Sequence, residues 1–490
     1  MTTCSELFKG LDCTIIGNGS EEVTGLAYRS DAVQPGNVFF CIVGLKVDGH
    51  SFAQDAIDRG AKVLVVERKL YLAATDDVTL VVVNDSRKAM AHAAALFYGS
   101  PSKEFALVGV TGTNGKTTTT YLVEQIARAA GKRTGVIGTV GIEVAGVREK
   151  ASRTTPESPD LQRTFARMRD EDVDMVAMEV SSHALDLLRT WHTDFAVTAF
   201  SNLTQDHLDY HHTFEAYFEA KALLFSSDYP AKRVICIDDK WGKELLRRCS
   251  AADDWVITTG FDPAAQIKPV SVEYFTDHTE VELDVRGQRV SFAYPLVGRF
   301  NVENVMCAYG IGMALGISQN IIVDALSQAP QVPGRLERVK ANDGGVSVFV
   351  DYAHTPDALE KAIASIKALC KARTIVVFGC GGDRDSTKRS IMGRTALDAD
   401  FAVVTSDNPR TEKPEAIIED IVSGMGEGAG RYEVVPDRRE AIARAIELAE
   451  PGDSILIAGK GHEDYQIVGD KVLSFDDRKV AAEELERKNA

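Results

Sequence analysis

The chain has 490 residues, of which 44% are hydrophobic and 26% are charged, and its formal net charge at pH 7 is −17. This length exceeds what one hydrophobic core supports, and it predicts about three domains. A strongly acidic chain is a poor partner for nucleic acid, because phosphate backbones attract basic surfaces. No apolar run approaches the ~18 residues of a membrane span, and the N-terminus lacks the layout of a signal peptide. Since the eight cysteines form no CxxC pair, we expect reduced thiols, no zinc site and a cytoplasmic protein without membrane insertion.

Two turn-rich breaks divide the chain. The first, at Tyr98–Ser102, closes a helix predicted over Lys88–Phe97, and the second, at Gln331–Arg335, contains a Pro-Gly pair after another helix. These breaks predict domains at residues 1–102, 103–334 and 335–490. The sequence contains no internal repeat and no low-complexity tract.

Short apolar runs alternate with helical patterns in the second and third blocks, which predicts an α/β fold with parallel sheets covered on both faces. In the second block the predicted elements are strands at Phe105–Val110, Val173–Val180 and Phe195–Phe200 and a helix at Thr117–Ala130. In the third block they are strands at Val346–Val350, Thr374–Phe378, Phe401–Thr405 and Ser454–Ala458 and a helix at Arg439–Ala449. Such sheets bind ligands beyond the carboxyl ends of their strands.

A glycine-bearing turn follows the first strand of the second block and leads into a helix that begins at a Lys-Thr pair. This layout is typical of a phosphate-binding loop, although the first glycine of the general pattern falls on Val110. Lys116 is expected to reach the β- and γ-phosphates of ATP, and the Thr117 hydroxyl to hold Mg²⁺. An exposed glycine turn with a chance lysine is the alternative, but strand, turn and helix all fall where the mechanism needs them. The candidate ATP-binding residues are Gly112, Thr113, Asn114, Gly115, Lys116, Thr117 and Thr118.

The segment Thr111–Thr118 resembles the loop of the Mur ligases and their folylpolyglutamate synthetase relatives, more than that of kinases or GTPases. Members of this family join a carboxylate to an amine, and they use ATP to convert the poorly electrophilic acid into an acyl phosphate. The resemblance implies an ATP-dependent, amide-forming ligase that produces ADP and phosphate. It also implies an N-terminal UDP-binding α/β domain, a central P-loop ATPase domain and a C-terminal Rossmann-like α/β domain.

Candidate metal ligands follow the next two predicted strands. Glu179 ends one strand and is a hard oxygen ligand suited to Mg²⁺, whereas His207 follows the next strand and Lys221 lies in a later helical run. The resemblance implies that Glu179 and His207 help to hold Mg²⁺ and that Lys221 is carbamylated, which turns a cation into an anionic ligand. A lone helical lysine is otherwise usually solvated. We therefore expect Lys116, Glu179, His207 and Lys221 to be catalytic and Thr117 to share in metal binding.

The adenine side of the nucleotide site is expected near Gly298–Asn304, which resembles the family's GxFNxxN segment. The amides of Asn301 and Asn304 each offer a donor and an acceptor to an adenine edge, with helix capping as the alternative for Asn304. The resemblance implies that Arg335, at the second break, contacts the nucleotide on domain closure. It also suggests that Asp351 orients the ribose and phosphate region.

The acceptor amine is expected at three strand ends of the last block, and the resemblance points to the branch that adds the third residue of the peptidoglycan stem peptide. In this branch an Asp-Asn-Pro-Arg motif accompanies meso-diaminopimelate, whose extra carboxylate an arginine can grip with two hydrogen bonds. Alone, such a tetrapeptide would be an ordinary turn; two further segments, at residues 379–385 and 459–466, make it specific. The candidate acceptor residues are Arg384, Asp407, Asn408, Pro409, Arg410, Gly459 and Glu463.

The donor implied by the resemblance is UDP-N-acetylmuramoyl-L-alanyl-D-glutamate. The first block resembles the family's UDP-binding domain through Tyr28–Asp31 and Pro35–Phe40, although it reads RSD where many members read DSR. Arg153 replaces an asparagine found in some relatives. The candidate donor-binding residues are Ser30, Thr154, Thr155, Ser181 and Arg189.

Three rival functions stay open at this point. The same ligase could use L-lysine, which Arg410 disfavours, or the chain could be a folylpolyglutamate synthetase-like ligase, which the block of about 100 residues before the loop disfavours. A nucleotide-binding scaffold without catalysis is the third, and retention of Lys116, Glu179, His207 and Lys221 disfavours it. We expect a monomer, although no residue pattern bears on the oligomeric state.

Overall fold

A computed structural model describes residues 2–44, 47–68, 70, 77–151, 153–249, 255–339, 345–370, 372–426 and 430–489. Contacts between Cα atoms divide the chain into two compact units. The first contains Met1–Thr111, Gly131–Ala199 and Phe218–Arg233, and the second contains Gly112–Ala130, Phe200–Tyr217 and Val234–Ala490. In the described part of the chain, no helix combines the length and the apolar character that crossing a membrane requires. The domain boundaries at residues 102 and 334 stay predictions.

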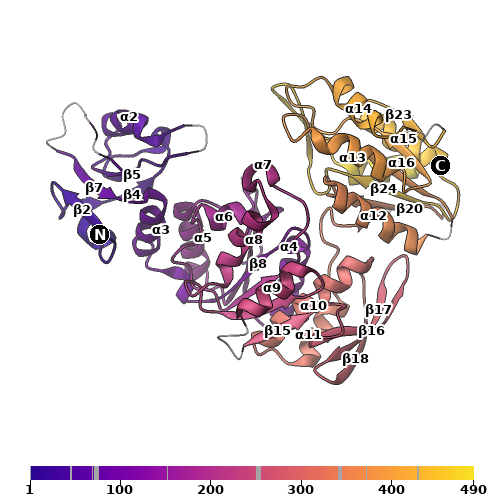
Figure 1. Ribbon diagram of the computed structural model, residues 1–490, viewed down its shortest axis with the longest axis horizontal. Helices are drawn as coiled ribbons and strands as arrows, with labels where there is room; N and C mark the ends of the chain where they lie inside the picture. Colours follow the sequence, from indigo (N-terminus) through magenta and orange to yellow (C-terminus); the bar gives the residue numbers. More distant parts are fainter. Residues whose placement is uncertain are drawn as a thin grey trace. The chain divides into compact units, whose positions relative to one another are not determined.

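The N-terminal part of the first unit is a five-stranded sheet of order β2-β7-β6-β5-β4. All neighbours are parallel except β2 and β7. Side chains alternate between the two faces, as the pleat requires: Val38 and Phe40 pack toward α3, and Phe39 packs toward α2, so these helices lie on opposite faces (Figure 1). The bounds are β1 (Thr2–Thr3), α1 (Cys4–Leu7), β2 (Cys13–Ile16), β3 (Glu22–Val23), β4 (Gly25–Ala27), η1 (Ser30–Ala32), β5 (Asn37–Phe40), η2 (Gly49–Phe52), α2 (Ala53–Asp58), β6 (Val63–Val66), β7 (Thr79–Val83), α3 (Ser86–Phe97) and η3 (Pro101–Lys103).

The remainder of the first unit carries a mixed sheet of order β11-β10-β9-β12-β8-β13. Strands β9, β12 and β8 are parallel, whereas β10 and β11 are antiparallel additions at one edge. The predicted parallel sheet is therefore present, but two antiparallel strands extend it, because positive φ at Gly141 and Gly146 allows tight reversals in place of crossovers. The bounds are β8 (Ala106–Thr111), β9 (Thr134–Gly138), β10 (Gly141–Val144), β11 (Val147–Glu149), α5 (Ser158–Asp170), β12 (Met175–Glu179), α6 (Ser182–Asp186), β13 (Val197–Phe200), α8 (Phe214–Ala222) and η4 (Leu223–Phe225).

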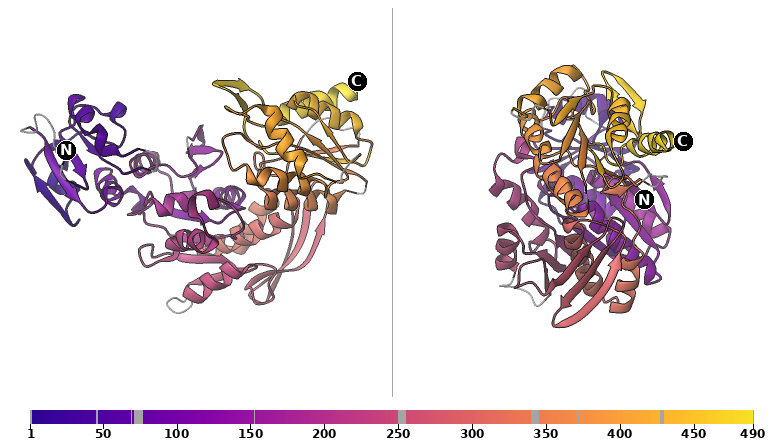
Figure 2. Two further views of the ribbon diagram at one scale, coloured as in Figure 1. Left: turned by 45° about the horizontal axis from the view of Figure 1, so that its top comes forward. Right: turned by 90° about the vertical axis from the view of Figure 1, so that its right-hand side faces the viewer.

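The second unit contains the helix after the phosphate loop, α4, which packs against α10 and α11. It also contains strands in the order β15-β16-β17-β18, of which the last three are antiparallel and are drawn in salmon, residues 267–294, in Figure 2. The bounds are α4 (Lys116–Ala129), α7 (Leu208–His211), β14 (Lys232–Cys236), where the chain enters this unit for the last time, α9 (Lys240–Cys249), β15 (Val256–Thr259), β16 (Ile267–Tyr274), β17 (Thr279–Val285), β18 (Gln288–Tyr294), α10 (Arg299–Ala314) and α11 (Gln319–Ser327).

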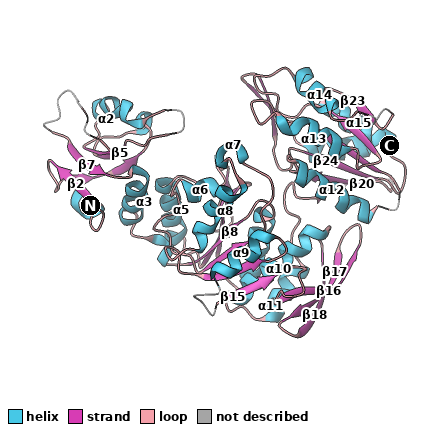
Figure 3. Cartoon of the chain, in the orientation of Figure 1, coloured by secondary structure: helices cyan, strands magenta, loops and turns pink. Residues whose placement is uncertain are grey.

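The C-terminal part of the second unit is a doubly wound sheet of order β19-β20-β24-β21-β22-β23, parallel except for β19. Val376 and Phe378 pack under α12, α13 and α14, and Ile375 and Val377 pack under α15 and α16, so helices cover both faces as predicted (Figure 3). The bounds are β19 (Glu337–Arg338), β20 (Ser347–Asp351), α12 (Pro356–Leu369), β21 (Thr374–Phe378), α13 (Thr387–Ala396), β22 (Phe401–Val404), α14 (Pro414–Ser423), β23 (Tyr432–Val434), α15 (Arg438–Leu448), β24 (Ser454–Ala458), β25 (Tyr465–Val468), β26 (Lys471–Ser474) and α16 (Asp477–Lys488).

Candidate functional site

The phosphate loop of the second unit needs glycine at two positions. Gly112 has φ of 148° and Gly115 has φ of 86°, a region that side chains with a Cβ rarely adopt. A Cβ on Gly112 would overlap Ser201 Oγ, and one on Gly115 would overlap Asn304 Oδ1. Both glycines therefore bring the backbone closer to its neighbours than any other residue could.

Hydrogen bonds hold this loop in one shape. Lys116 Nζ donates to the carbonyl oxygens of Gly112 and Thr113 at 2.9 and 2.8 Å. The Thr113 N–H donates to Asn202 O at 2.9 Å, and the Asn114 N–H donates to Asn202 Oδ1 at 2.9 Å. Asn202 is the second residue after β13, and sequence reasoning assigned it no role. The loop is thus braced on the segment after the neighbouring strand, with its lysine folded over it.

Arg335 reaches the first turn of α4, and its contact with the nucleotide stays a prediction. Its Nη2 donates to Thr117 Oγ1 at 3.0 Å, and its guanidinium lies 4.8 Å from the ring centroid of Tyr352. Asp351 fixes the backbone around this arginine, because its carboxylate accepts the N–H groups of Leu336 at 2.7 Å and Ala353 at 2.8 Å. Burial raises the pKa of Asp351.

The two asparagines of α10 form a buried pair beside the loop. Asn304 Nδ2 donates to Asn301 Oδ1 at 3.0 Å, and Asn301 Nδ2 donates to Val297 O at 2.8 Å. The N-cap position of α10 is occupied by Gly298, and no side chain makes a capping hydrogen bond there. Both asparagines lie inside the helix, so neither of them caps it. The capping alternative for Asn304 is therefore wrong.

His207 stands at the start of α7 with φ of 54°, next to an acidic neighbour that sequence reasoning left unassigned. The His207 N–H donates to Asp206 Oδ1 at 2.9 Å, and His207 Nε2 lies 3.4 Å from Asp206 Oδ2. Burial alone would raise the pKa of Asp206, but the charges of His207, His354 and Lys116 lower it overall. Asp206 is thus an anionic carboxylate in the field of Lys116.

Glu179, in the first unit, is buried and held by both carboxylate oxygens. Thr139 donates its N–H to Glu179 Oε1 at 2.8 Å and its hydroxyl to Oε2 at 3.0 Å. A Cβ on Gly138 would overlap Glu179 Oε1, so the residue before Thr139 must have no side chain. Thr154 joins this group, because its hydroxyl lies 3.1 Å from that of Thr139.

The other predicted donor residues of the first unit lie around the end of β12. Thr155 Oγ1 donates to Glu179 O at 2.9 Å and accepts the Ser181 N–H at 3.1 Å, and Arg189 Nη1 donates to Thr155 O at 3.1 Å. Ser30 lies in η1, in the N-terminal part of the first unit, and its side chain lowers the pKa of Asp55. The residues just before η1 contact α5, because the Tyr28 hydroxyl donates to Asp160 Oδ2 at 2.6 Å.

Lys221 lies on α8 of the first unit with 1% of its surface exposed. The alternative of an ordinary solvated lysine is therefore wrong. The predicted catalytic and metal-binding residues fall in both units, with Glu179 and Lys221 in the first and Lys116, Thr117 and His207 in the second.

Two of the predicted acceptor residues, Asn408 and Glu463, meet beyond the carboxyl ends of β22 and β24. Asn408 Nδ2 donates to Glu463 Oε2 at 2.9 Å. Lys460, which is fully buried, donates to Asn408 Oδ1 at 3.2 Å and to Glu463 Oε2 at 3.1 Å. Lys460 is a site residue that sequence reasoning missed, although it stands inside the segment that pointed to Glu463.

Two backbone positions shape the same cluster. Arg410, after Pro409, has φ of 52°, and its Nη1 donates to Gly382 O at 2.7 Å. Gly459 has φ of 113°, and a Cβ there would come within 2.5 Å of Asp407 Oδ2. Arg384 lies exposed in the loop after β21, and no described hydrogen bond of its side chain ties it to this cluster.

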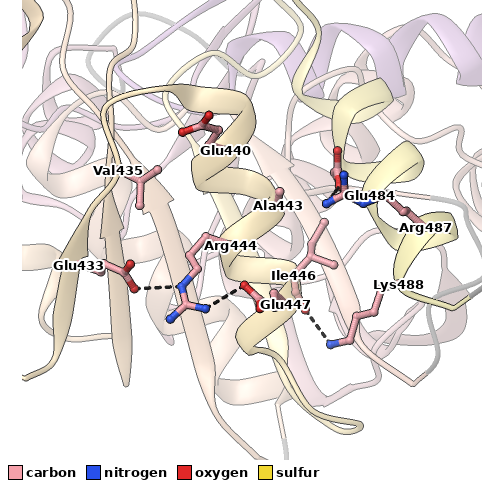
Figure 4. Close-up of a pocket in the computed structure, with 10 residues that line it drawn as sticks. All are labelled: Glu433, Val435, Glu440, Ala443, Arg444, Ile446, Glu447, Glu484, Arg487 and Lys488. Atoms are coloured by element: carbon pink, nitrogen blue, oxygen red, sulfur yellow. Dashed lines mark hydrogen bonds and ion pairs between the residues drawn. The ribbon is translucent and has the colours of Figure 1, made fainter.

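A cavity of about 550 Å³ lies elsewhere, between β23, α15 and α16. One of its arginines, Arg444, contacts Glu433 at 3.1 Å and Glu447 at 2.8 Å (Figure 4). No predicted site residue lines it.

Three family models match the chain in succession. They are the Mur ligase family catalytic domain at residues 22–98, the Mur ligase middle domain at 110–312 and the Mur ligase glutamate ligase domain at 334–461. Together they cover both units.

Similar proteins carry related names. UDP-N-acetylmuramoyl-L-alanyl-D-glutamate–2,6-diaminopimelate ligase of Geobacillus thermodenitrificans is 46% identical over 94% of this chain and 95% of its own, and that of Clostridium botulinum is 42% identical over 97% and 98%. A solved structure of a ligase of that name has a TM-score of 0.70 at 30% identity and covers 100% of this chain and 99% of its own. Folylpolyglutamate synthase of Mycobacterium tuberculosis, solved with ADP and AMPPCP, shares the fold at 19% identity, with a TM-score of 0.63 over 82% of this chain and 94% of its own. The chain belongs to the Mur ligase family.

Proposed function

We propose that the protein is an ATP-dependent ligase that joins meso-diaminopimelate to the D-glutamate carboxyl of UDP-N-acetylmuramoyl-L-alanyl-D-glutamate, a step of peptidoglycan precursor synthesis. The names of the relatives over nearly their whole length support the donor and the acceptor. The observation that supports the acceptor is the cluster of Asn408, Arg410 and Glu463 beyond the carboxyl ends of β22 and β24, the two strands that flank β21.

The phosphate loop is the proposed site of ATP. Backbone N–H groups at the start of α4, from Gly115 to Thr118, attract the triphosphate, whereas Asn202 already accepts the N–H groups of Thr113 and Asn114. Lys116, already directed along the loop by two carbonyl oxygens, places its positive charge beside the β- and γ-phosphates. Asn301 and Asn304 are proposed to face the adenine, and Arg335 and Asp351 the ribose and phosphates.

The proposed reaction has two steps. An oxygen of the donor carboxylate attacks the γ-phosphorus of ATP, which forms an acyl phosphate and releases ADP. The amine nitrogen of the acceptor then attacks the acyl carbon, phosphate leaves with its oxygen, and the nitrogen loses a proton to give the amide. Fixed donors and charges accelerate both steps by stabilising the negative charge that moves onto phosphate oxygens.

Mg²⁺ is the proposed metal, and the residues present suit it. The Thr117 hydroxyl and the carboxylate of Glu179, fixed by Thr139, offer the oxygen ligands that Mg²⁺ prefers. His207 and a carbamylated Lys221 complete the proposed set. When bound, the ion supplies positive charge that offsets the triphosphate and the incoming carboxylate.

At the acceptor site, Arg410 and Arg384 are proposed to bind the far carboxylate of meso-diaminopimelate. Asp407, Asn408, Gly459 and Glu463 are proposed to hold its far amino group. A buried Lys460 fixes Glu463 in place. Lysine lacks the far carboxylate, so it would offer the two guanidinium groups no anionic partner.

One assay tests the function. Purified protein is given ATP, Mg²⁺ and the UDP-muramoyl dipeptide, and phosphate release is measured with meso-diaminopimelate or L-lysine. We expect release only when donor and amine are both present, with meso-diaminopimelate preferred. A preference for L-lysine would mean that lysine, not meso-diaminopimelate, is the acceptor. Activity with a folate and glutamate would favour the synthetase alternative. No phosphate release with any amine would contradict the ligase function. A cytoplasmic location, where ATP is supplied, and a monomeric state stay predictions.

A further inference from the structure

Three arginine side chains of the first unit converge on one buried carboxylate, that of Glu157. Arg189 Nη2 lies 3.0 Å from Glu157 Oε1, and Arg153 Nη1 lies 3.2 Å from the same oxygen. Arg87 Nη1 lies 3.4 Å from Glu157 Oε2. The arginines come from α3, from the segment before α5 and from the segment after α6, so the fold assembles them from three distant parts of the chain.

The cluster carries more positive than negative charge. Three guanidinium groups face one carboxylate, and the nearby carboxylate of Asp160 is engaged elsewhere, because it accepts the Tyr28 hydroxyl at 2.6 Å and Arg163 Nη2 at 2.6 Å. Like charges at such spacing repel strongly where water is excluded. Burial lowers the pKa of Arg189 despite its contact with Glu157, and the charges of the other two arginines act in the same direction.

One donor in the cluster has no acceptor. Among the described residues, Arg189 Nε is buried and makes no hydrogen bond, although Nη1 of the same group donates to Thr155 O. A buried N–H without an acceptor is costly and uncommon in folded proteins. Surplus charge and an unpaired donor are both relieved by an added oxyanion.

Two of the three arginines are partly exposed to solvent. Arg153 has 52% and Arg87 has 20% of its side-chain surface exposed, whereas Arg189 and Glu157 are buried. Arg153 directly precedes Thr154 and Thr155, which belong to the proposed donor site.

We propose that Arg87 and Arg153 complete, together with Arg189, a cationic site that binds an oxyanion of the UDP-linked donor. This inference rests on the proposed function and adds Arg87 and Arg153 to the proposed donor site. The donor carries oxyanions of two kinds, the diphosphate of UDP and the carboxylates of its peptide, and guanidinium forks suit both.

Arg153→Gln tests the site, because this half-exposed side chain can be changed without disturbing a core. Its matched control is Arg163→Gln, at an arginine 61% exposed on the neighbouring α5 and paired with Asp160. By calorimetric titration with the UDP-muramoyl dipeptide, Arg153→Gln should bind about ten-fold more weakly than the unaltered protein, whereas the control should change by about two-fold at most. The affinity of Arg153→Gln should also fall less steeply with added salt, because fewer charges attract the donor.

Titration with UDP alone separates the two sources of the oxyanion. If Arg153→Gln lowers the affinity for UDP and for the complete donor by the same factor, the site binds the diphosphate. If it weakens only the complete donor, the site binds a peptide carboxylate. Arg87→Lys keeps the charge but loses the planar fork, so it should lower the affinity for the same ligand. Because Arg87 is less exposed, the unfolding temperature of this variant shows whether the protein still folds.

Unchanged donor affinity and unchanged salt dependence in Arg153→Gln would overturn the inference, and an unchanged affinity in a folded Arg87→Lys would remove Arg87 from the site. These results differ from a failure of the proposed function. That failure would appear as an unaltered protein that releases no phosphate with donor and meso-diaminopimelate.

Discussion

Gly115 illustrates, at the scale of one residue, how the phosphate loop depends on a missing side chain. Its φ of 86° and the overlap of a Cβ with Asn304 Oδ1 give two separate reasons for glycine. We expect Gly115→Ala to destabilise the fold by about 1–2 kcal/mol and to lower ADP affinity at least about ten-fold, because the Asn301–Asn304 pair must move. Gly131→Ala is the control, since Gly131 has φ of 76° but open space around it. Calorimetric titration with ADP should separate the two, and an equal loss of affinity would contradict the role of Gly115.

Arg410 is the residue on which acceptor choice is expected to depend. Its guanidinium is held by Gly382 O at the end of the loop after β21. We expect Arg410→Ala to raise the KM for meso-diaminopimelate about ten-fold or more and to leave the KM for ATP nearly unchanged. Arg410→Lys keeps the charge but loses the two-pronged contact, so it should recover only part of the loss. An unchanged KM for meso-diaminopimelate in Arg410→Ala would discard the assignment.

The Lys221 side chain is buried, and carbamylation offers a chemical reason for a lysine to be buried there. If the group is a carbamate, ligase activity should fall in buffer freed of CO₂ and return when bicarbonate is added. Lys221→Ala should lose activity by about a hundred-fold or more in either buffer, as measured by phosphate release. Full activity in Lys221→Ala would contradict a role for this residue, and a bicarbonate response in that variant would contradict the carbamate.

At the scale of elements, a buried ion pair joins α15 to α16. Arg438 and Asp477 have no exposed side-chain surface and lie 2.7 Å apart at the helix starts, and Arg438 also donates to Ala458 O at the end of β24. We expect Arg438→Met to lower the free energy of unfolding by about 3–5 kcal/mol, because Asp477 would keep its charge without a partner. Its neighbour provides the control: Arg439 pairs with Glu483 at a half-exposed site, so Arg439→Met should cost about 0–1 kcal/mol. Urea unfolding of both variants checks this, and equal losses would contradict it.

The elements themselves show what a sequence pattern can and cannot predict. Continuous apolar runs such as Thr374–Phe378 and Ser454–Ala458 became strands with the predicted bounds, because a strand buried on both faces has almost no polar positions. The antiparallel strands β10, β11 and β16 to β18 escaped prediction. Their polar and apolar residues alternate only partly, as in the half-exposed β16, so their pairing is decided by tight turns and neighbouring strands.

At the scale of the whole molecule, one acid should make stability depend on pH. Burial and the nearby charge of Asp238 raise the pKa of Glu303 from 4.5 to about 7. A raised pKa means that the folded state favours the protonated acid, so its stabilising contribution is complete below pH 4.5 and is lost as pH rises through about 7. Glu303→Gln should therefore gain stability relative to the unaltered protein between pH 5 and pH 8, on the order of 1–3 kcal/mol.

Unfolding by urea at both pH values measures this difference. Glu280→Gln, at a side chain 56% exposed, serves as the control and should change the free energy of unfolding little at either pH. A gap between Glu303→Gln and the unaltered protein that stays constant with pH would contradict the account.

The sequence by itself determined the α/β class, the strands of the parallel core and the position of the phosphate loop. These depend on local signals, namely apolar runs, glycines at a strand–helix junction and the helix that follows. The resemblance to a ligase family also came from short contiguous motifs, such as those around Lys116 and Arg410.

Only the tertiary structure decided which side chains share a site. The bracing of the loop by Asn202, the buried Lys460 between Asn408 and Glu463, and the arginines around Glu157 all join residues far apart in the chain. Local sequence carries no record of such contacts, because they arise when strand ends from different crossovers meet at one edge of a sheet. Burial, which turns an ordinary lysine into a candidate ligand at Lys221, likewise exists only once the chain has packed.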